Sequence, residues 1–318
     1  MGRVSEAASG TLWAVMNPAA RGYAVMRRVL ESACRDAGLP APIVATTTVD
    51  ADGYPQARDA VAAGARVVVV AGGDGTVREV ARAVAGTGVE LGILPIGTAN
   101  LFAYNLRLRT RKPLLAVDRA LFAPARTVDI GWASWREVTP EGAVGAPTAE
   151  RPFLVMAGLG HDAATVGTTS PRLKRHLGWL SYLASGARHL FARPLAMRVS
   201  LDNAPGRRVQ TWTLLVANAG TIPGGIEVFP DAVPDDGLLD VMELPLRTRA
   251  QWGPVAFAGL TGHRLDTTAL RYTKVRTLWA VPDDPAPLHL DGDDVGPVAD
   301  LRIRVQHAAL RVRAPAGS

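Results

Sequence analysis

A glycine-rich turn that contains one carboxylate is the part of the sequence best suited to chemistry. Residues 72–76, GGDGT, follow an apolar run at 67–70, and residues 77–85 repeat apolar side chains at helical spacing. This pattern predicts a buried strand that turns directly into a helix. Because glycine lets a ligand approach the backbone and a helix start presents N–H groups, such a turn suits phosphate. Asp74 adds a carboxylate for a cation or hydroxyl, although the turn could also be a tight connection with Asp74 as a helix N-cap.

Two further turns of the same kind lie on either side of this one. Residues 95–100, PIGTAN, follow the apolar stretch 91–94, and residues 17–22, NPAARG, follow the strand candidate 12–16. Each turn leads into a helix-like segment. In open α/β sheets, ligands bind at the carboxyl ends of the strands. Three polar strand ends therefore favour a nucleotide crevice over three unrelated connections.

The elements that must position these turns divide the chain in two. Strand and helix patterns alternate from residue 12 to about residue 125, which predicts βα units and a parallel sheet. From residue 129 onward strands and turns dominate, interrupted by a helix pattern at 171–191. Residues 1–10 read as a loose tail and 139–151 as a hairpin loop or insertion. The later strand candidates are 153–157, 195–201, 209–216, 239–244, 274–281 and 301–305.

Taken in chain order, NPAARG, GGDGTVREV and PIGTAN resemble motifs of the diacylglycerol kinase catalytic domain family. That family includes bacterial soluble lipid kinases and sphingosine kinases, and it is related to NAD kinases and phosphofructokinases. The likeness covers essentially residues 11–310. It continues through RTVDIG at 126–131, FLVMAGLGHDA at 153–163, KRHLGWLSY at 174–182, DGLLDV at 236–241 and LDGD at 290–293.

The resemblance implies a fold of two domains. Residues 11–128 would form a Rossmann-like α/β nucleotide-binding domain with a parallel sheet, and residues 129–300 a β-sandwich-like lipid-substrate domain. Residues 301–318 would return to pack on the first domain. The active site is expected in the interdomain cleft.

The resemblance also implies the reaction, which is transfer of the terminal phosphoryl group of ATP to a lipid hydroxyl with the help of Mg²⁺. The lipid would be diacylglycerol-like or sphingoid-like. The catalytic candidates are Asp293, Asp291 and Asp74. The nucleotide would be held by Asn17, Pro18, Thr46, Thr47, Gly72, Gly73, Asp74, Gly75, Thr76, Gly97, Thr98 and Asn100, with the choice among the threonines at 46–48 left open.

The candidate base departs from the family pattern. Relatives place a glutamate third in a D-G-E turn as proton acceptor from the lipid hydroxyl, whereas this chain has Asp293 followed by Asp294. Aspartate is one methylene shorter, and a general base must reach hydrogen-bond distance. Either the site is adjusted, or Asp294 helps, or activity is reduced. A catalytically weak nucleotide- and lipid-binding regulator is therefore one alternative. NAD kinase is another, since it shares GGDGT, but it does not account for the other motifs.

A second, structural Mg²⁺ is implied near Asp236, with main-chain oxygens of Val233 and Leu238 as further ligands. Oxygen ligands from a tight turn suit a hard cation. Without the resemblance, residues 235–237 read as an ordinary acidic turn. The resemblance also implies an inner network that includes Asp129 and Lys174.

Charge and composition bear on partners. The net charge is +6, and basic residues cluster in two runs. A basic face can bind nucleic acid or an anionic membrane. The absence of a nucleic-acid motif and a 6% aromatic content favour peripheral membrane contact, which a kinase of bilayer lipids needs. The runs are Arg107, Arg109, Arg111 and Lys112, and Arg172, Lys174, Arg175, His176 and Arg188.

The helix pattern at 171–191 strengthens the membrane prediction. Trp179 and Tyr182 lie beside a leucine stripe, with basic residues at its start, as in an interfacial helix. The alternative is a helix whose apolar stripe packs on a sheet.

The remaining features limit location. The single cysteine, Cys34, rules out a disulfide framework and a cysteine metal site. No apolar stretch reaches the roughly 18 residues of a spanning helix, and no secretion signal is apparent at the start. We expect a cytoplasmic protein, with peripheral contact at the inner membrane face. The particular lipid and the oligomeric state do not follow from the sequence.

Overall fold

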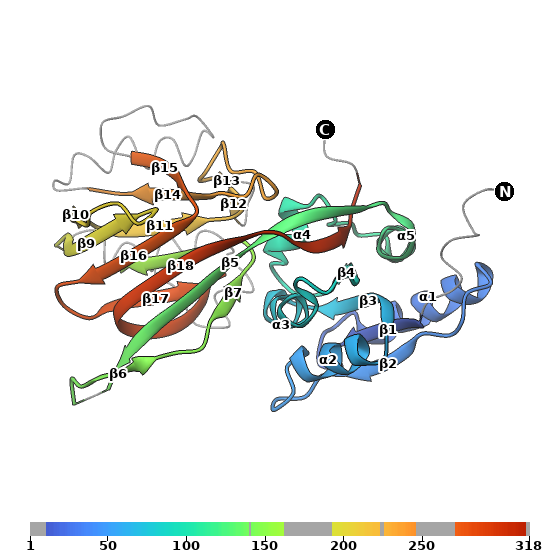
Figure 1. Ribbon diagram of the computed structural model, residues 1–318. Helices are drawn as coiled ribbons and strands as arrows, with labels where there is room; N and C mark the ends of the chain where they lie inside the picture. The colour runs from blue at the N-terminus through green and yellow to red at the C-terminus, as the bar shows by residue number, and fades with distance from the viewer. Residues whose placement is uncertain (1–10, 140, 162–192, 223–225, 246–270, 316–318) are drawn as a thin grey trace. The chain divides into compact units, whose positions relative to one another are not determined.

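The computed structural model describes residues 11–139, 141–161, 193–222, 226–245 and 271–315 (Figure 1). The predicted tail at 1–10 and the predicted helix at 171–191, with Lys174 and the second basic run, lie outside these residues. The chain forms two compact units, one of Met1–Val128 with Ala308–Ser318 and the other of Asp129–His307. We call them the α/β unit and the β unit.

The α/β unit is built on a parallel sheet in the order β2-β1-β3-β4, with the end of β18 beside β4. The strands are β1 (Thr11–Met16), β2 (Ile43–Thr46), β3 (Ala65–Gly72), β4 (Glu90–Pro95) and the last residues of β18 (Asp293–Arg313). The helices are α1 (Tyr23–Asp36), α2 (Tyr54–Ala62), α3 (Asp74–Val84), α4 (Leu101–Asn105) and α5 (Pro113–Phe122).

The central strand β3 explains the valine run. Val67 and Val69 pack in one core with α1 and α5, while Val68 and Val70, on the opposite face, are fully buried as well. Helices α2 and α3 contact each other and β3. A parallel strand covered on both faces is uniformly apolar rather than alternating. Cys34 of α1 is buried in this core.

The return of β18 to the α/β unit is held by backbone and charge. Arg311 pairs with Glu90 in the parallel ladder of β18 and β4. The buried Glu90 carboxylate accepts hydrogen bonds from Arg311 Nη2 at 3.0 Å and from Arg313 Nε at 2.8 Å. Two arginines of β18 therefore neutralise the carboxylate that β4 buries.

The β unit is antiparallel. One set of strands runs β15-β14-β11-β8-β17-β18, and a second runs β10-β9-β16-β18, with β5 pairing β18, β6 and β7. The strands are β5 (Ala125–Val138), β6 (Val144–Pro147), β7 (Arg151–Phe153), β8 (Met156–Gly160), β9 (Leu195–Leu201), β10 (Arg207–Thr211), β11 (Thr213–Ala217), β12 (Thr221–Ile222), β13 (Ile226–Glu227), β14 (Leu239–Glu243), β15 (Arg271–Val275), β16 (Thr277–Pro282), β17 (Ala286–Leu290) and β18.

The two sets of strands enclose one apolar core. Phe153, Leu159, Val241, Met197 and Leu278 meet in it, so side chains of both sets contribute. The long strand β18 belongs to both, because it pairs first with β17 and then with β16. This is a β-sandwich. The predicted fold class, a parallel α/β part followed by a β-sandwich part, is confirmed.

Several strand boundaries differ from the predictions. The predicted strand 153–157 is interrupted at residues 154–155, 209–216 at Trp212, and 274–281 at Arg276. In each case a distant group takes backbone N–H groups out of the ladder. The acceptors are the Asp291 carboxylate, the Leu244 carbonyl and the Asp202 carboxylate. The predicted strand 301–305 is only the middle of β18.

Candidate functional site

The polar turns of the α/β unit follow four neighbouring strands. NPAARG follows β1, Thr47 follows β2, GGDGT begins in the last residue of β3, and PIGTAN begins in the last residue of β4. The turns prolong the sheet, since the Asn17 N–H donates to the Ala71 carbonyl at 2.8 Å and the Thr47 N–H to the Met16 carbonyl at 3.0 Å. All the predicted nucleotide residues therefore lie at the carboxyl ends of neighbouring strands in one sheet.

The GGDGT and PIGTAN turns touch backbone to backbone. A Cβ added to Gly97 would overlap the Cα of Gly73, so no side chain fits between them. The N–H groups of Ile96 and Gly97 both donate to the Gly72 carbonyl. Close approach of the two loops thus requires glycine at position 97, while an added Cβ on Gly73 would lie at an ordinary contact distance of 3.7 Å from Gly97.

Asp74 joins the same two turns through its side chain. Its Oδ1 accepts a hydrogen bond of 2.6 Å from the N–H of Leu101, the first residue of α4. Asp74 is also the first residue of α3, whose N-cap is Gly73 and has no side-chain cap. The alternative in which Asp74 is the N-cap of its own helix is therefore wrong, and its carboxylate instead fixes the start of α4.

Asn100 is the most constrained polar residue of this edge. It has a φ of 49°, in the left-handed region, and its Nδ2 donates to the Gly97 carbonyl at 2.7 Å. The side chain is buried, and within the described residues its Oδ1 has no hydrogen-bond partner. A buried acceptor is normally paired, so this oxygen is suited to a donor from a ligand.

The remaining predicted nucleotide residues differ in how far they are exposed to solvent. Asn17 Oδ1 accepts from the Ala19 N–H at 2.9 Å, which fixes the NPAARG turn, while Pro18 and Thr98 are exposed. Thr76 covers Gly72. Of the consecutive threonines, Thr47 is buried, and Thr46 is the exposed end of β2.

In the β unit, the predicted D-G turn is a two-residue hairpin between β17 and β18. Asp291 and Gly292 have φ values of 51° and 84°, and Leu290 pairs with Asp293. Two successive positive φ values are typical of a type I′ turn, which favours Asp-Gly and matches the twist of the strands. The turn therefore fixes where Asp293 leaves the sheet.

The carboxylate of Asp291 accepts hydrogen bonds from three backbone N–H groups. Its Oδ2 accepts from Leu154 N at 2.9 Å, and its Oδ1 accepts from Val155 N at 2.8 Å and Met156 N at 3.0 Å. The side chain is buried. An ionised carboxylate with three N–H donors is a strong fixed anchor. This geometry favours Asp291 as an organiser of the hairpin rather than as a proton acceptor.

Asp293 and Asp294 behave differently. Both are exposed, and Asp294 Oδ1 accepts from the Gly296 N–H at 3.1 Å within a local turn. Asp293 is the first residue of β18, next to the anchored turn. Asp293 and Asp294 thus both reach solvent from the β17–β18 hairpin, and the Asp294 carboxylate holds a local turn.

Asp129 is completely buried where the chain enters the β unit. Its Oδ2 accepts from Gly237 N at 2.7 Å, and its Oδ1 lies 2.9 Å from His307 Nδ1. Its backbone is held as well, by the Pro234 carbonyl and by Asn218 Nδ2. Asp129 is thus the centre of a buried hydrogen-bond network with Gly237, His307 and Asn218. Lys174, its partner in the predicted inner network, lies outside the described residues, so that pairing stays a prediction.

Sequence reasoning missed two members of this network. Asn218 donates to the carbonyls of Asp129 and Leu154, at 2.9 and 3.2 Å, and follows β11 directly. A polar residue at the end of a predicted strand was a usable signal for it. His307 had no signal, because it becomes informative only once β18 brings it to Asp129.

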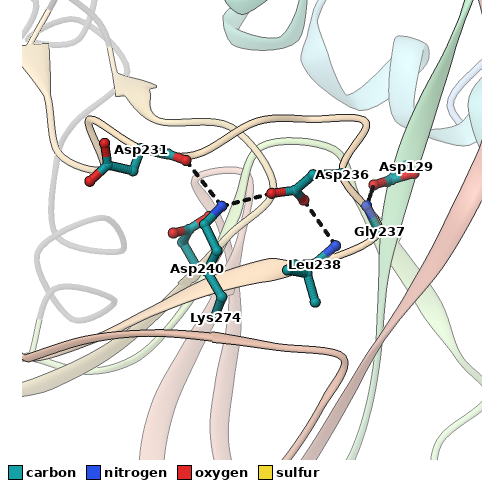
Figure 2. Close-up of polar contacts among 7 residues, drawn as sticks. All are labelled: Asp129, Asp231, Asp236, Gly237, Leu238, Asp240 and Lys274. Carbon is teal, nitrogen blue, oxygen red and sulfur yellow. Dashed lines mark hydrogen bonds and ion pairs between the residues drawn. The ribbon is translucent and has the colours of Figure 1, made fainter.

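The turn predicted to bind the structural Mg²⁺ lies against the ammonium group of Lys274, which comes from β15 (Figure 2). Asp236 Oδ1 accepts from Leu238 N at 3.0 Å, and Asp236 Oδ2 lies 2.7 Å from Lys274 Nζ. In the part of the chain that the structure describes, no three His, Cys, Asp or Glu side chains converge as a metal site. The predicted ligands, Val233, Asp236 and Leu238, therefore do not fit a metal here, since the only carboxylate among them is paired with an ammonium.

Comparisons with known proteins agree with these features. Residues 11–133 match the model of the diacylglycerol kinase catalytic domain, and residues 155–314 match that of the YegS C-terminal NAD kinase beta sandwich-like domain. A Pseudomonas putida protein named "Probable lipid kinase YegS-like" is 32% identical over 266 residues, covering 82% of this chain and 81% of its own. A Bacillus subtilis protein named "Diacylglycerol kinase" is 28% identical over 252 residues, covering 78% of this chain and 77% of its own.

Solved structures share the fold. A crystal structure from Bacillus anthracis superimposes with a TM-score of 0.77 at 18% identity and covers 96% of this chain and 95% of that one. A diacylglycerol kinase structure from the same organism gives a TM-score of 0.68 at 17% identity, covering 96% and 97%. With family matches on both halves of the chain and relatives of this extent, the chain belongs to the diacylglycerol kinase catalytic domain family of lipid kinases, with a YegS-type C-terminal domain.

Proposed function

We propose that the protein is an ATP- and Mg²⁺-dependent lipid kinase that phosphorylates a hydroxyl of a diacylglycerol-like or sphingoid-like lipid. The observation that carries the proposal is the joining of GGDGT to PIGTAN by the Asp74–Leu101 hydrogen bond and the Gly73–Gly97 approach. In a chain of the lipid kinase family, two loops locked together at the carboxyl ends of β3 and β4 are suited to one nucleotide.

The nucleotide would use both backbone and side-chain groups. The first N–H groups of α3 have no acceptor within the helix and favour phosphate oxygens. The buried Oδ1 of Asn100 would accept from a hydroxyl or amino group of the nucleotide. Asp74 would supply a carboxylate oxygen of the kind that Mg²⁺ prefers, and Mg²⁺, when bound with ATP, would offset the phosphate charge.

The acceptor side of the reaction would use Asp293. As the lipid oxygen forms its bond to the terminal phosphorus, the bond from that phosphorus to the ADP oxygen breaks, and Asp293 takes the hydroxyl proton. Asp291 would contribute by holding the hairpin that presents Asp293. Asp294, whose carboxylate holds a local turn, has no role in the transfer.

A direct assay tests this function. Purified protein is incubated with ATP radiolabelled in the terminal phosphate, Mg²⁺, and vesicles that contain either diacylglycerol or a sphingoid base. We expect label in the organic extract that depends on one of these lipids. Binding of ATP and vesicles without turnover across a broad lipid panel would favour the regulator alternative, and NADP formation from NAD would favour an NAD kinase.

The protein must also reach lipid at a bilayer, and we assign this contact to the segment before and at the start of α5. Arg107, Arg109, Arg111 and Lys112 are all exposed there, and Leu114 is 71% exposed. Exposed basic groups beside an exposed leucine suit an anionic membrane surface. Within the described residues, no helix is both long and apolar enough to cross a bilayer.

This membrane contact predicts that the affinity of the protein for anionic vesicles depends on its basic residues and falls as salt is added. Each basic residue near an anionic surface contributes about 1 kcal/mol, so replacing both Arg111 and Lys112 with glutamine should weaken binding to anionic vesicles about thirtyfold. The measurement is vesicle co-sedimentation, with neutral vesicles as reference. The matched control replaces the exposed Arg28 and Arg35 of α1, which removes the same charge. Equal losses in both double variants would contradict the assignment.

A further inference from the structure

The Lys274 ammonium lies at the centre of an oxygen cluster in the β unit (Figure 2). Lys274 of β15 faces Asp240 of β14 across the ladder. Its Nζ donates to Asp236 Oδ2 at 2.7 Å, to the Asp231 carbonyl at 3.0 Å and to Asp240 Oδ2 at 3.2 Å. An ammonium has three N–H donors, so all of them are used. The cation therefore joins three points of one segment, residues 231, 236 and 240.

The oxygen atoms around the Lys274 ammonium require a positive charge. They belong to two carboxylates and one main-chain carbonyl, the oxygen chemistry typical of hard metal ions. The Asp240 side chain is only 8% exposed, and a carboxylate this buried needs a positive partner. Lys274 supplies that partner from the neighbouring strand.

The cluster also fixes the turn that contacts Asp129. Asp236 uses its second oxygen to accept from the Leu238 N–H, and the residue between them, Gly237, donates to the buried Asp129 carboxylate. The ammonium, the turn and Asp129 therefore form one continuous set of bonds.

We propose that Lys274 is a built-in cation of the 231–240 segment and serves in place of a bound structural divalent ion. The expected consequence is that the folded β unit is insensitive to removal of divalent metal. The proposal rests on these contacts and does not depend on the lipid kinase reaction.

The test is thermal unfolding of the full chain without nucleotide, in EDTA and in millimolar Mg²⁺. We compare the rise in Tm caused by Mg²⁺ in the wild type with the rise in Asp236→Asn. The difference between the two rises reports an ion at this cluster, because ions bound elsewhere raise both Tm values equally. We expect this difference to be zero. A rise that disappears in Asp236→Asn would overturn the proposal.

Variants of Lys274 sharpen the result. Lys274→Met should lower the Tm in EDTA by several degrees and make it rise with Mg²⁺, since the freed carboxylates then favour a divalent ion. Lys112→Met removes an exposed lysine of the α/β unit and should change neither value. A Tm of Lys274→Met equal to that of Lys112→Met would also overturn the proposal. If Lys274→Met does not fold, the wild-type comparison above still decides.

Discussion

The Asp293→Asn variant should lose phosphoryl transfer to lipid by about 10²–10⁴-fold while it keeps the wild-type Tm. Asparagine has the shape of aspartate but cannot take a proton from the attacking hydroxyl. The fold should tolerate the change, because Asp293 is exposed and the hairpin is held by Asp291. The measurements are initial rates with radiolabelled ATP, once an acceptor lipid has been found, and a thermal melt of both proteins.

The adjacent carboxylate is the matched control. Asp294→Asn removes the same charge one residue away, from a side chain that holds the Gly296 turn, and should keep most of the activity. Equal loss in the two variants would remove Asp293 as the specific base. Asp293→Glu tests the shorter reach: a faster rate would mean that the aspartate limits the reaction, and a slower one that the site is adjusted to it.

The Asp291→Ala variant should instead lose stability, by about 3–5 kcal/mol, since three buried N–H groups would lose their acceptor. The donors belong to residues 154–155, which link β7 and β8, and to Met156, which begins β8, so the loss should weaken the sandwich. Denaturant unfolding measures it. Asp294→Ala is the control on the same hairpin and should cost no more than about 1 kcal/mol, because one exposed hydrogen bond is lost.

The outcome separates two roles for Asp291. A large fall in stability, with activity reduced in proportion to unfolding, identifies an anchor. Wild-type stability with abolished transfer would show that Asp291 takes part in the chemistry and that the backbone contacts are incidental.

The elements of the α/β unit could be predicted because their signals are local. The valine run of β3, the turn that follows it and the apolar spacing of α3 are contiguous in sequence, and each favours the same structure. The bond between Asp74 and Leu101 could not be predicted, since it depends on two loops 27 residues apart meeting at one sheet edge. The sequence therefore located the edge but not how its turns are joined.

The β unit was less predictable because its polar contacts span long distances in the chain. Asp291 anchors residues about 135 positions earlier, and Lys274 reaches Asp236 and Asp240 from another strand. Neither partnership leaves a periodic pattern. The lysine beside the predicted metal ligands was missed for the same reason: the DDG turn is visible in sequence, while the lysine that meets it is not.

The lipid kinase assignment is tested most directly by following the phosphoryl group into an unbiased mixture. Protein, Mg²⁺ and ATP with heavy oxygen in its terminal phosphate are incubated with a total bacterial lipid extract, and mass spectrometry locates the heavy label. We predict that it appears in a lipid that gained a phosphate on a free hydroxyl and that it is absent with Asp293→Asn. Label confined to inorganic phosphate, with none in any lipid, would contradict the account.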